Sequence, residues 1–182
     1  MHWMTLTLST GLLCLAAGAA LAVGDETEPA APPEPTETTE LCEEAFIWDP
    51  ETEVCVPIED APQEGAALVP LIRELAHHGR YSDAASLLDR LPPDDGFTLK
   101  YRGLVARQSG DFPAAQAFYL AAIVNDPKNH LARAYYGIGL VGEARFIEAA
   151  LQLREIRAQG GAGGWPARAL TEAIAGGAIH DY

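Results

Sequence analysis

The stretch Arg107-Gln-Ser-Gly-Asp-Phe-Pro-Ala-Ala115 decides the fold, because the chain carries two degenerate copies of it. An earlier copy reads Gly79-Arg80-Tyr81 and a later one reads Ala144-Arg145-Phe146. The turn position is therefore Gly79 in the first copy, Gly110 in the second and Ala144 in the third. Small and bulky residues keep the same offsets after each copy, at Ala84 and Leu88, Ala115 and Tyr119, and Ala149 and Leu153. Self-similarity at such a period predicts helix–turn–helix units stacked into a solenoid.

Residues 96–129 show the fullest set of spaced positions, namely Leu99, Gly103, Gly110-Asp111, Ala115, Tyr119, Ala122 and Asp126-Pro127. This set resembles the tetratricopeptide repeat, with Leu99 in place of the family's Trp. Arg102 and Ala106 depart from the pattern, which has Leu and Tyr there. Residues 65–95 and 130–159 match more loosely. The resemblance therefore implies three tetratricopeptide-like repeats over 65–159.

The last unit needs a cover, because a helix pair cannot bury its apolar stripe alone. Residues 160–182 provide a Gly-rich loop, Gly160–Gly164, and then a segment that begins with Pro166 at a first helical position. Leu170 and Ile174 give this segment an apolar edge. We therefore expect an all-α protein, a short tetratricopeptide-like helical solenoid with a C-terminal capping helix.

The N-terminal part is expected to be an export signal and a linker. Residues 1–22 lack charged side chains and end in Ala20-Leu21-Ala22, which predicts signal-peptide cleavage after Ala22 and a periplasmic or secreted protein. An uncleaved N-terminal anchor is the alternative, because no Lys or Arg precedes the apolar run, and this anchor would be the protein's one membrane contact. Residues 23–41 are rich in Pro and Glu, which predicts a disordered acidic linker.

Residues 42–57 are expected to form a small hairpin closed by a Cys42–Cys55 disulfide, since an even pair of cysteines in an exported protein favours a bond. We expect this disulfide to stabilise the hairpin and to matter little for the repeat. The segment also faintly resembles one loop of peritrophin-type chitin-binding modules. That resemblance implies a glycan-binding or cell-wall-binding structural component as one alternative function.

Charge and motifs limit the function. Residues 1–64 contain 14 of the 26 Asp and Glu and no Lys or Arg, whereas residues 65–182 hold 12 acidic and all 12 basic residues. Nucleic-acid binding needs clustered cations, so no nucleic-acid partner is expected. The adjacent His77 and His78 point apart on a helix, and no catalytic, metal-binding or cofactor-binding pattern is evident. We expect a protein that is not an enzyme and has no cofactor.

The expected function is to hold another protein or peptide in the concave face of the repeats. The first helix of each unit lines that face in tetratricopeptide folds. The residues at the corresponding positions are Arg73, Lys100, Tyr101, Leu104, Arg107, Gln108, Tyr135 and Ile138. Their positive charges suit a partner bearing carboxylates. Three alternatives remain open: an ordinary solvated surface, a groove occupied by the acidic leader 25–44, and an accessory subunit of an envelope enzyme.

Overall fold

The computed structural model describes residues 33–176. The expected signal segment 1–22, the first part of the linker and residues 177–182 lie outside this range. In chain order the elements are α1 (Glu37–Glu40), β1 (Phe46–Asp49), β2 (Val54–Pro57), the short 3-10 helix η1 (Ile58–Asp60), α2 (Gly65–His77), α3 (Tyr81–Leu88), α4 (Gly96–Gln108), α5 (Phe112–Asn125), α6 (His130–Gly142), α7 (Phe146–Ala158) and α8 (Trp165–Gly176).

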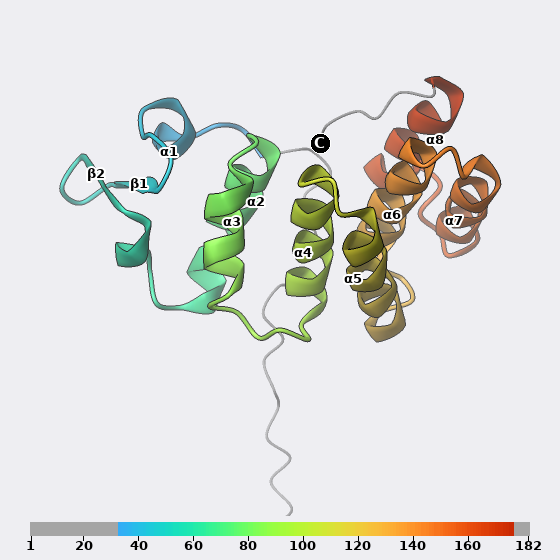
Figure 1. Cartoon of the computed structure of the whole chain (residues 1–182), viewed down its shortest axis with the longest axis horizontal. Helices are drawn as coiled ribbons and strands as arrows, with labels where there is room; N and C mark the ends of the chain where they lie inside the picture. The colour runs from blue at the N-terminus through green and yellow to red at the C-terminus, as the bar shows by residue number, and fades with distance from the viewer. Residues whose placement is uncertain (1–32, 177–182) are drawn as a thin grey trace, which may run out of the picture.

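The helices from α2 onward are arranged as three consecutive pairs and a final single helix. Figure 1 shows α2 beside α3, α4 beside α5 and α6 beside α7, with α8 packed on the last pair at one end of the molecule. The short hairpin of β1 and β2 lies at the opposite end with α1. The expected all-α solenoid with a capping helix is confirmed. Within residues 33–176, no helix combines the length and the apolar character that a membrane crossing requires.

The first helix of each pair ends in the same way. Gly79, Gly110 and Ala144 adopt left-handed backbone conformations, with φ of 80°, 83° and 58°. The next amide in each case donates to a carbonyl five residues back, as in Asp111 to Ala106 at 2.9 Å. This is the Schellman arrangement, which reverses the chain after a helix and satisfies its last carbonyls. The copies found in the sequence are therefore copies of one backbone turn.

Within the middle pair, a glycine allows the two helices to come into contact. A Cβ atom at Gly103 would lie 2.5 Å from the ring of Tyr119. Ala115 and Tyr119 on α5 are fully buried against it. In the first pair, the position of Gly103 is occupied by Ile72 and the position of Tyr119 by Leu88, and both side chains are buried. The larger residue on one helix is thus matched by a smaller one on the other.

The C-terminal end of the solenoid is covered by α8. A Cβ atom at Gly137 on α6 would lie 2.6 Å from the side chain of Leu170, which is fully buried. At the start of α8, the ring of Trp165 meets that of Tyr135 edge-on at 6.3 Å between centroids. This helix occupies the place that the next repeat would take, so it buries the last exposed stripe.

The N-terminal end is covered by the hairpin, and two expectations change as a result. Cys42 and Cys55 are disulfide-bonded and β1 pairs antiparallel with β2, as predicted. However, Ile47 of β1 belongs to the same hydrophobic core as α2 and α3, so the hairpin is not separate from the repeat. Residues 33–41, expected to be the end of a disordered linker, contain α1 and are held against α2 by side-chain hydrogen bonds.

Candidate functional site: a hollow between the second and third helix pairs

The residues predicted to line an open groove divide into two groups in the structure. Tyr101, Leu104, Tyr135 and Ile138 are at most 1% exposed and belong to the hydrophobic core. The expectation that these four side chains lie open to a partner is wrong. The physical reason is that α4 and α6 contact helices of their own pair and of the neighbouring pairs, so little of either helix surface remains free.

Two of the predicted groove cations, Arg73 and Lys100, are also partly or fully buried. Lys100 is 6% exposed, and its ammonium group lies 5.6 Å from the centre of the Phe97 ring and 5.5 Å from that of Tyr101. Contacts of this kind between a cation and ring faces stabilise a desolvated charge. Arg73 on α2 is partly buried. Lys100 therefore serves the packing of α4 in the described part of the chain.

Arg107 and Gln108 are also partly buried, but they line a hollow of about 320 Å³. Both lie on the last turn of α4. The other walls come from the start of α5 and the end of α6, through Gly110, Phe112, Gly139, Gly142 and Glu143. The hollow thus lies where the turn of the second pair meets the first helix of the third pair.

Glycine is required in the wall of this hollow. A Cβ atom at Gly139 would lie 2.5 Å from the ring of Phe112 and 3.2 Å from Cδ of Arg107. The absence of a side chain at 139 lets α6 approach these two residues. Sequence reasoning found Arg107 and Gln108 but missed Gly139, although its place two residues after Gly137 could have signalled close packing.

The charged residues that line the hollow are Arg107 on α4 and Glu143 at the end of α6. Behind the guanidinium lies the Tyr119 hydroxyl, whose burial raises the pKa well above its ordinary value while the charge of Arg107 lowers it in part. The phenol therefore stays neutral and does not compensate the cation. Gln108 is held in place because its Nε2 donates to the hydroxyl of Tyr81 at 2.9 Å. The arrangement offers donors from one wall and a carboxylate from the other.

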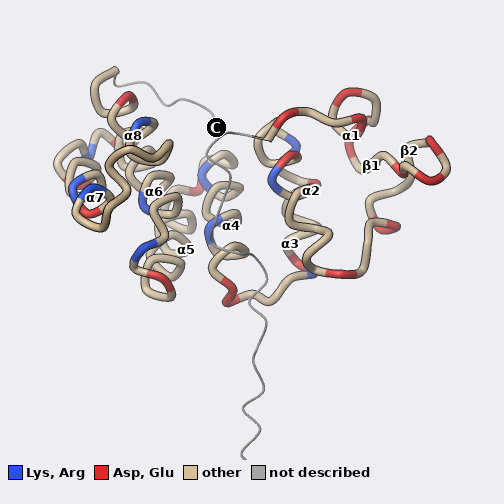
Figure 2. Tube along the Cα trace, turned by 180° about the vertical axis from the view of Figure 1, so that it is seen from behind, with Lys and Arg blue, Asp and Glu red and all other residues tan. Residues whose placement is uncertain are grey.

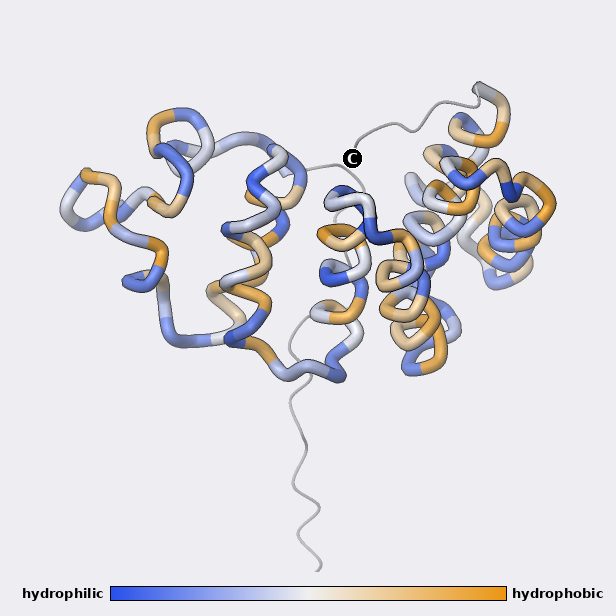
Figure 3. Tube along the Cα trace, in the orientation of Figure 1, coloured by the Kyte–Doolittle hydropathy of each residue, from blue (hydrophilic) through white to orange (hydrophobic). Residues whose placement is uncertain are grey.

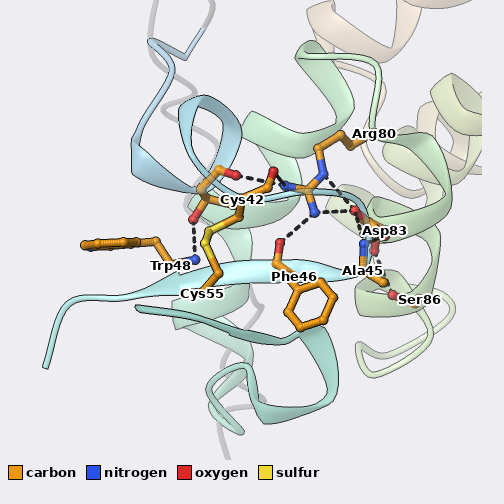
Figure 4. A network of polar contacts seen from close by, with 9 residues as sticks. Cys42, Ala45, Phe46, Trp48, Cys55, Arg80, Asp83 and Ser86 are labelled. Carbon is orange, nitrogen blue, oxygen red and sulfur yellow. Dashed lines mark hydrogen bonds and ion pairs between the residues drawn. A yellow bond between two sulfur atoms is a disulfide. The ribbon is translucent and has the colours of Figure 1, made fainter. Parts of the chain in front are cut away.

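A second polar cluster joins the hairpin to the first helix pair (Figure 4). The Arg80 guanidinium donates to the backbone carbonyls of Thr38 at 2.9 Å and Phe46 at 2.6 Å, and more distantly to that of Cys42. It also forms an ion pair with Asp83, whose carboxylate accepts from the amide of Ala45 at 3.1 Å. Both charged side chains are more than nine-tenths buried.

Glu74 anchors the residues just before the hairpin. Its carboxylate accepts hydrogen bonds from the amide and hydroxyl of Thr36 at 2.8 Å and from the hydroxyl of Thr39 at 2.7 Å. The residues 36–42 of the acidic leader thus contact α2 and the start of α3. From the sequence, Arg80 was recognised only as part of the repeated turn, and neither Asp83 nor Glu74 was expected to anchor the hairpin. The spacing of Arg80 and Asp83 across one helical turn was the available signal, but it is equally common on solvated helix surfaces.

Among residues 33–176, no group of three or more His, Cys, Asp or Glu side chains is placed to hold a metal ion. Comparison of the chain with protein-family models, with curated proteins and with solved structures gave no match.

Proposed function

We propose that the protein is a tetratricopeptide-like scaffold that binds a carboxylate-bearing segment of another protein at the hollow between its second and third helix pairs. The observation that carries the proposal is the cavity between two repeat units, which the partly buried Arg107 lines together with Gln108 and Glu143. Charge-assisted hydrogen bonds from Arg to carboxylate are among the stronger and more specific polar contacts available to such a surface.

The walls of the hollow support a peptide as the ligand. Phe112 offers an apolar surface, Gln108 an amide held in place by Tyr81, and Gly139 and Gly142 backbone without side chains. A mixture of one apolar wall and a few fixed polar groups is typical of ligand pockets. The protein would act by binding rather than by catalysis.

We propose that this binding takes place in the periplasm or cell envelope. The disulfide between Cys42 and Cys55 supports this location, because such bonds persist in oxidising compartments. The uncharged segment that ends at Ala22 supports export of the chain.

Affinity purification from envelope extract tests the proposal with three variants. Arg107→Met removes the charge but keeps an apolar stem. It should lower recovery of the specific partner, because the binding free energy loses about 1.5–3 kcal/mol, the contribution of a hydrogen bond to a charged group. Glu143→Gln should increase recovery, because it removes the competing carboxylate from the opposite wall. Arg154→Met on the exposed surface of α7 is the control and should change nothing. Equal recovery with all three variants would contradict the proposed site.

A further inference from the structure

One face of β1 carries two aromatic side chains, Phe46 and Trp48, which lie two residues apart along the strand. Phe46 is 40% exposed, whereas Ile47 between the two points to the opposite face and is buried in the core. Trp48 is half-buried, and Figure 4 shows its indole pointing away from Arg80 and the helix pair. Apolar groups exposed together on a small rigid element mark a contact surface. We name Phe46 and Trp48 the hairpin patch.

The hairpin is rigid enough to present this patch. Its two strands are closed by the disulfide, and its backbone is held to the first helix pair through Phe46, Ala45 and Arg80. The residues that hold it use backbone groups of the hairpin, so the side chains of Phe46 and Trp48 are left for another contact. A surface that is ordered in advance loses less conformational entropy on binding.

The charge around the patch identifies the class of partner. Eleven of residues 33–64 are Asp or Glu, and none is Lys or Arg. Figure 2 shows this end of the molecule, from α1 to β2, with acidic residues and no basic ones, whereas both signs are mixed along α4 to α8. Four of the acidic residues are exposed close to the patch in sequence, namely Glu43, Glu44, Glu51 and Glu53.

We propose that the hairpin patch binds a Lys/Arg-rich segment with interspersed apolar residues, belonging to another protein. The carboxylates would pair with the ammonium and guanidinium groups, and the faces of Trp48 and Phe46 would take cations or apolar side chains. Anionic lipid and nucleic acid are repelled by the same charges. This surface lies at the opposite end of the chain from α7 and α8 and is independent of the hollow at Arg107.

Isothermal titration of the full chain with synthetic peptides tests the proposal. The probe is an N-acetylated, C-amidated peptide that alternates Lys and Arg with Val and Leu, and the comparison peptide has Gln in place of each cation. The cationic peptide should bind at low salt and the Gln peptide should not. High salt should weaken the binding, because exposed ion pairs are screened.

Matched variants locate the site. Glu51→Gln with Glu53→Gln should weaken binding of the cationic peptide about tenfold, the size expected when two exposed ion pairs are lost. Trp48→Leu should weaken binding of the cationic peptide roughly three- to tenfold, because leucine keeps the apolar contacts of the indole but has no ring face for a cation. Asp94→Asn with Glu172→Gln removes the same number of exposed charges from the helical part and should leave binding unchanged.

Four results would overturn the proposal. The first is that the Gln peptide binds as tightly as the cationic peptide, and the second is that the Asp94/Glu172 variant loses as much affinity as the Glu51/Glu53 variant. The third is concentration-dependent self-association that Trp48→Leu abolishes. The fourth is binding of chitin oligosaccharide at Trp48 without binding of the cationic peptide. The last two would assign the patch to a second copy of the chain or to a glycan.

Discussion

The first and third helix pairs begin their second helices with a similar pattern, Arg-aromatic-x-acidic, but the charged residues have different roles. Arg80 with Asp83 corresponds to Arg145 with Glu148, and in both pairs the two side chains bond across one helical turn. The first pair of charges is buried under the hairpin, and the guanidinium also binds three backbone carbonyls. The second pair is more exposed, and its guanidinium donates to Gln116 of the neighbouring unit at 2.8 Å, interacts with Tyr136 and lowers the pKa of Glu148.

The difference shows that the position in the solenoid decides what a repeated motif does. Among residues 33–176 no repeat precedes the first unit, so the hairpin covers it and is held by polar anchors to its backbone. The third unit is covered by α8 through apolar contacts such as Leu170 against Gly137, and its charged pair is left in solvent. Exposed ion pairs contribute little to stability, whereas loss of one member of a buried pair leaves the other charge unpaired.

The largest expected effect comes from Arg80→Met compared with Arg145→Met. Arg80→Met should lower the free energy of unfolding by about 3–5 kcal/mol, because Asp83 and the hairpin carbonyls lose their partner. Arg145→Met should leave the urea midpoint unchanged within error. Urea unfolding followed by helical circular dichroism measures both. Equal effects would show that the buried pair does not anchor the hairpin.

The disulfide gives the next test of the same anchor. Cys42→Ser with Cys55→Ser should lower the free energy of unfolding by roughly 2–4 kcal/mol. The loss should appear in the unfolding of the helices too, because Ile47 and Ile58 share the core of α2 and α3. This replaces the expectation that the bond matters for the hairpin alone. A normal helical transition in the variant would restore the original expectation.

Two glycine substitutions compare the middle of the solenoid with its capped end. Gly103→Ala should lower the free energy of unfolding by about 1–3 kcal/mol, the usual cost of overpacking, because the new methyl group meets the fixed ring of Tyr119. Gly137→Ala should lower it less, since the atoms it meets are the mobile end of Leu170. Thermal unfolding of both variants gives the order. A larger loss at Gly137 would mean that α8 is the more rigid contact.

The smallest effect concerns the turns. Ala144→Gly should raise the free energy of unfolding by about 0.5–1 kcal/mol, because Ala144 has φ of 58° and glycine adopts this conformation without strain. Gly110→Ala should lower it by a similar amount for the converse reason. The urea midpoints of the two variants should shift in opposite directions. A shared sign would indicate that the turns are not equivalent.

The repeat could be predicted from the sequence because its determinants are local. Gly79 and Gly110 specify a left-handed turn, and Ala115 and Tyr119 recur at spacings that fit one helix face. Each needs only its own segment and the neighbouring helix. The same holds for the Cys42–Cys55 bond, which follows from an even pair of cysteines a short distance apart.

The binding surface depended on tertiary contacts that the sequence does not display. Lys100, Leu104 and Ile138 share a pattern with Arg107, yet these three side chains are buried, whereas Arg107 lines a cavity between α4 and α6. The burial of Arg80 depends on a hairpin about 35 residues earlier in the chain, whereas its spacing from Asp83 is identical to that of the exposed Arg145 from Glu148. Periodicity determines which residues share a helix face, and the tertiary structure decides which faces remain open.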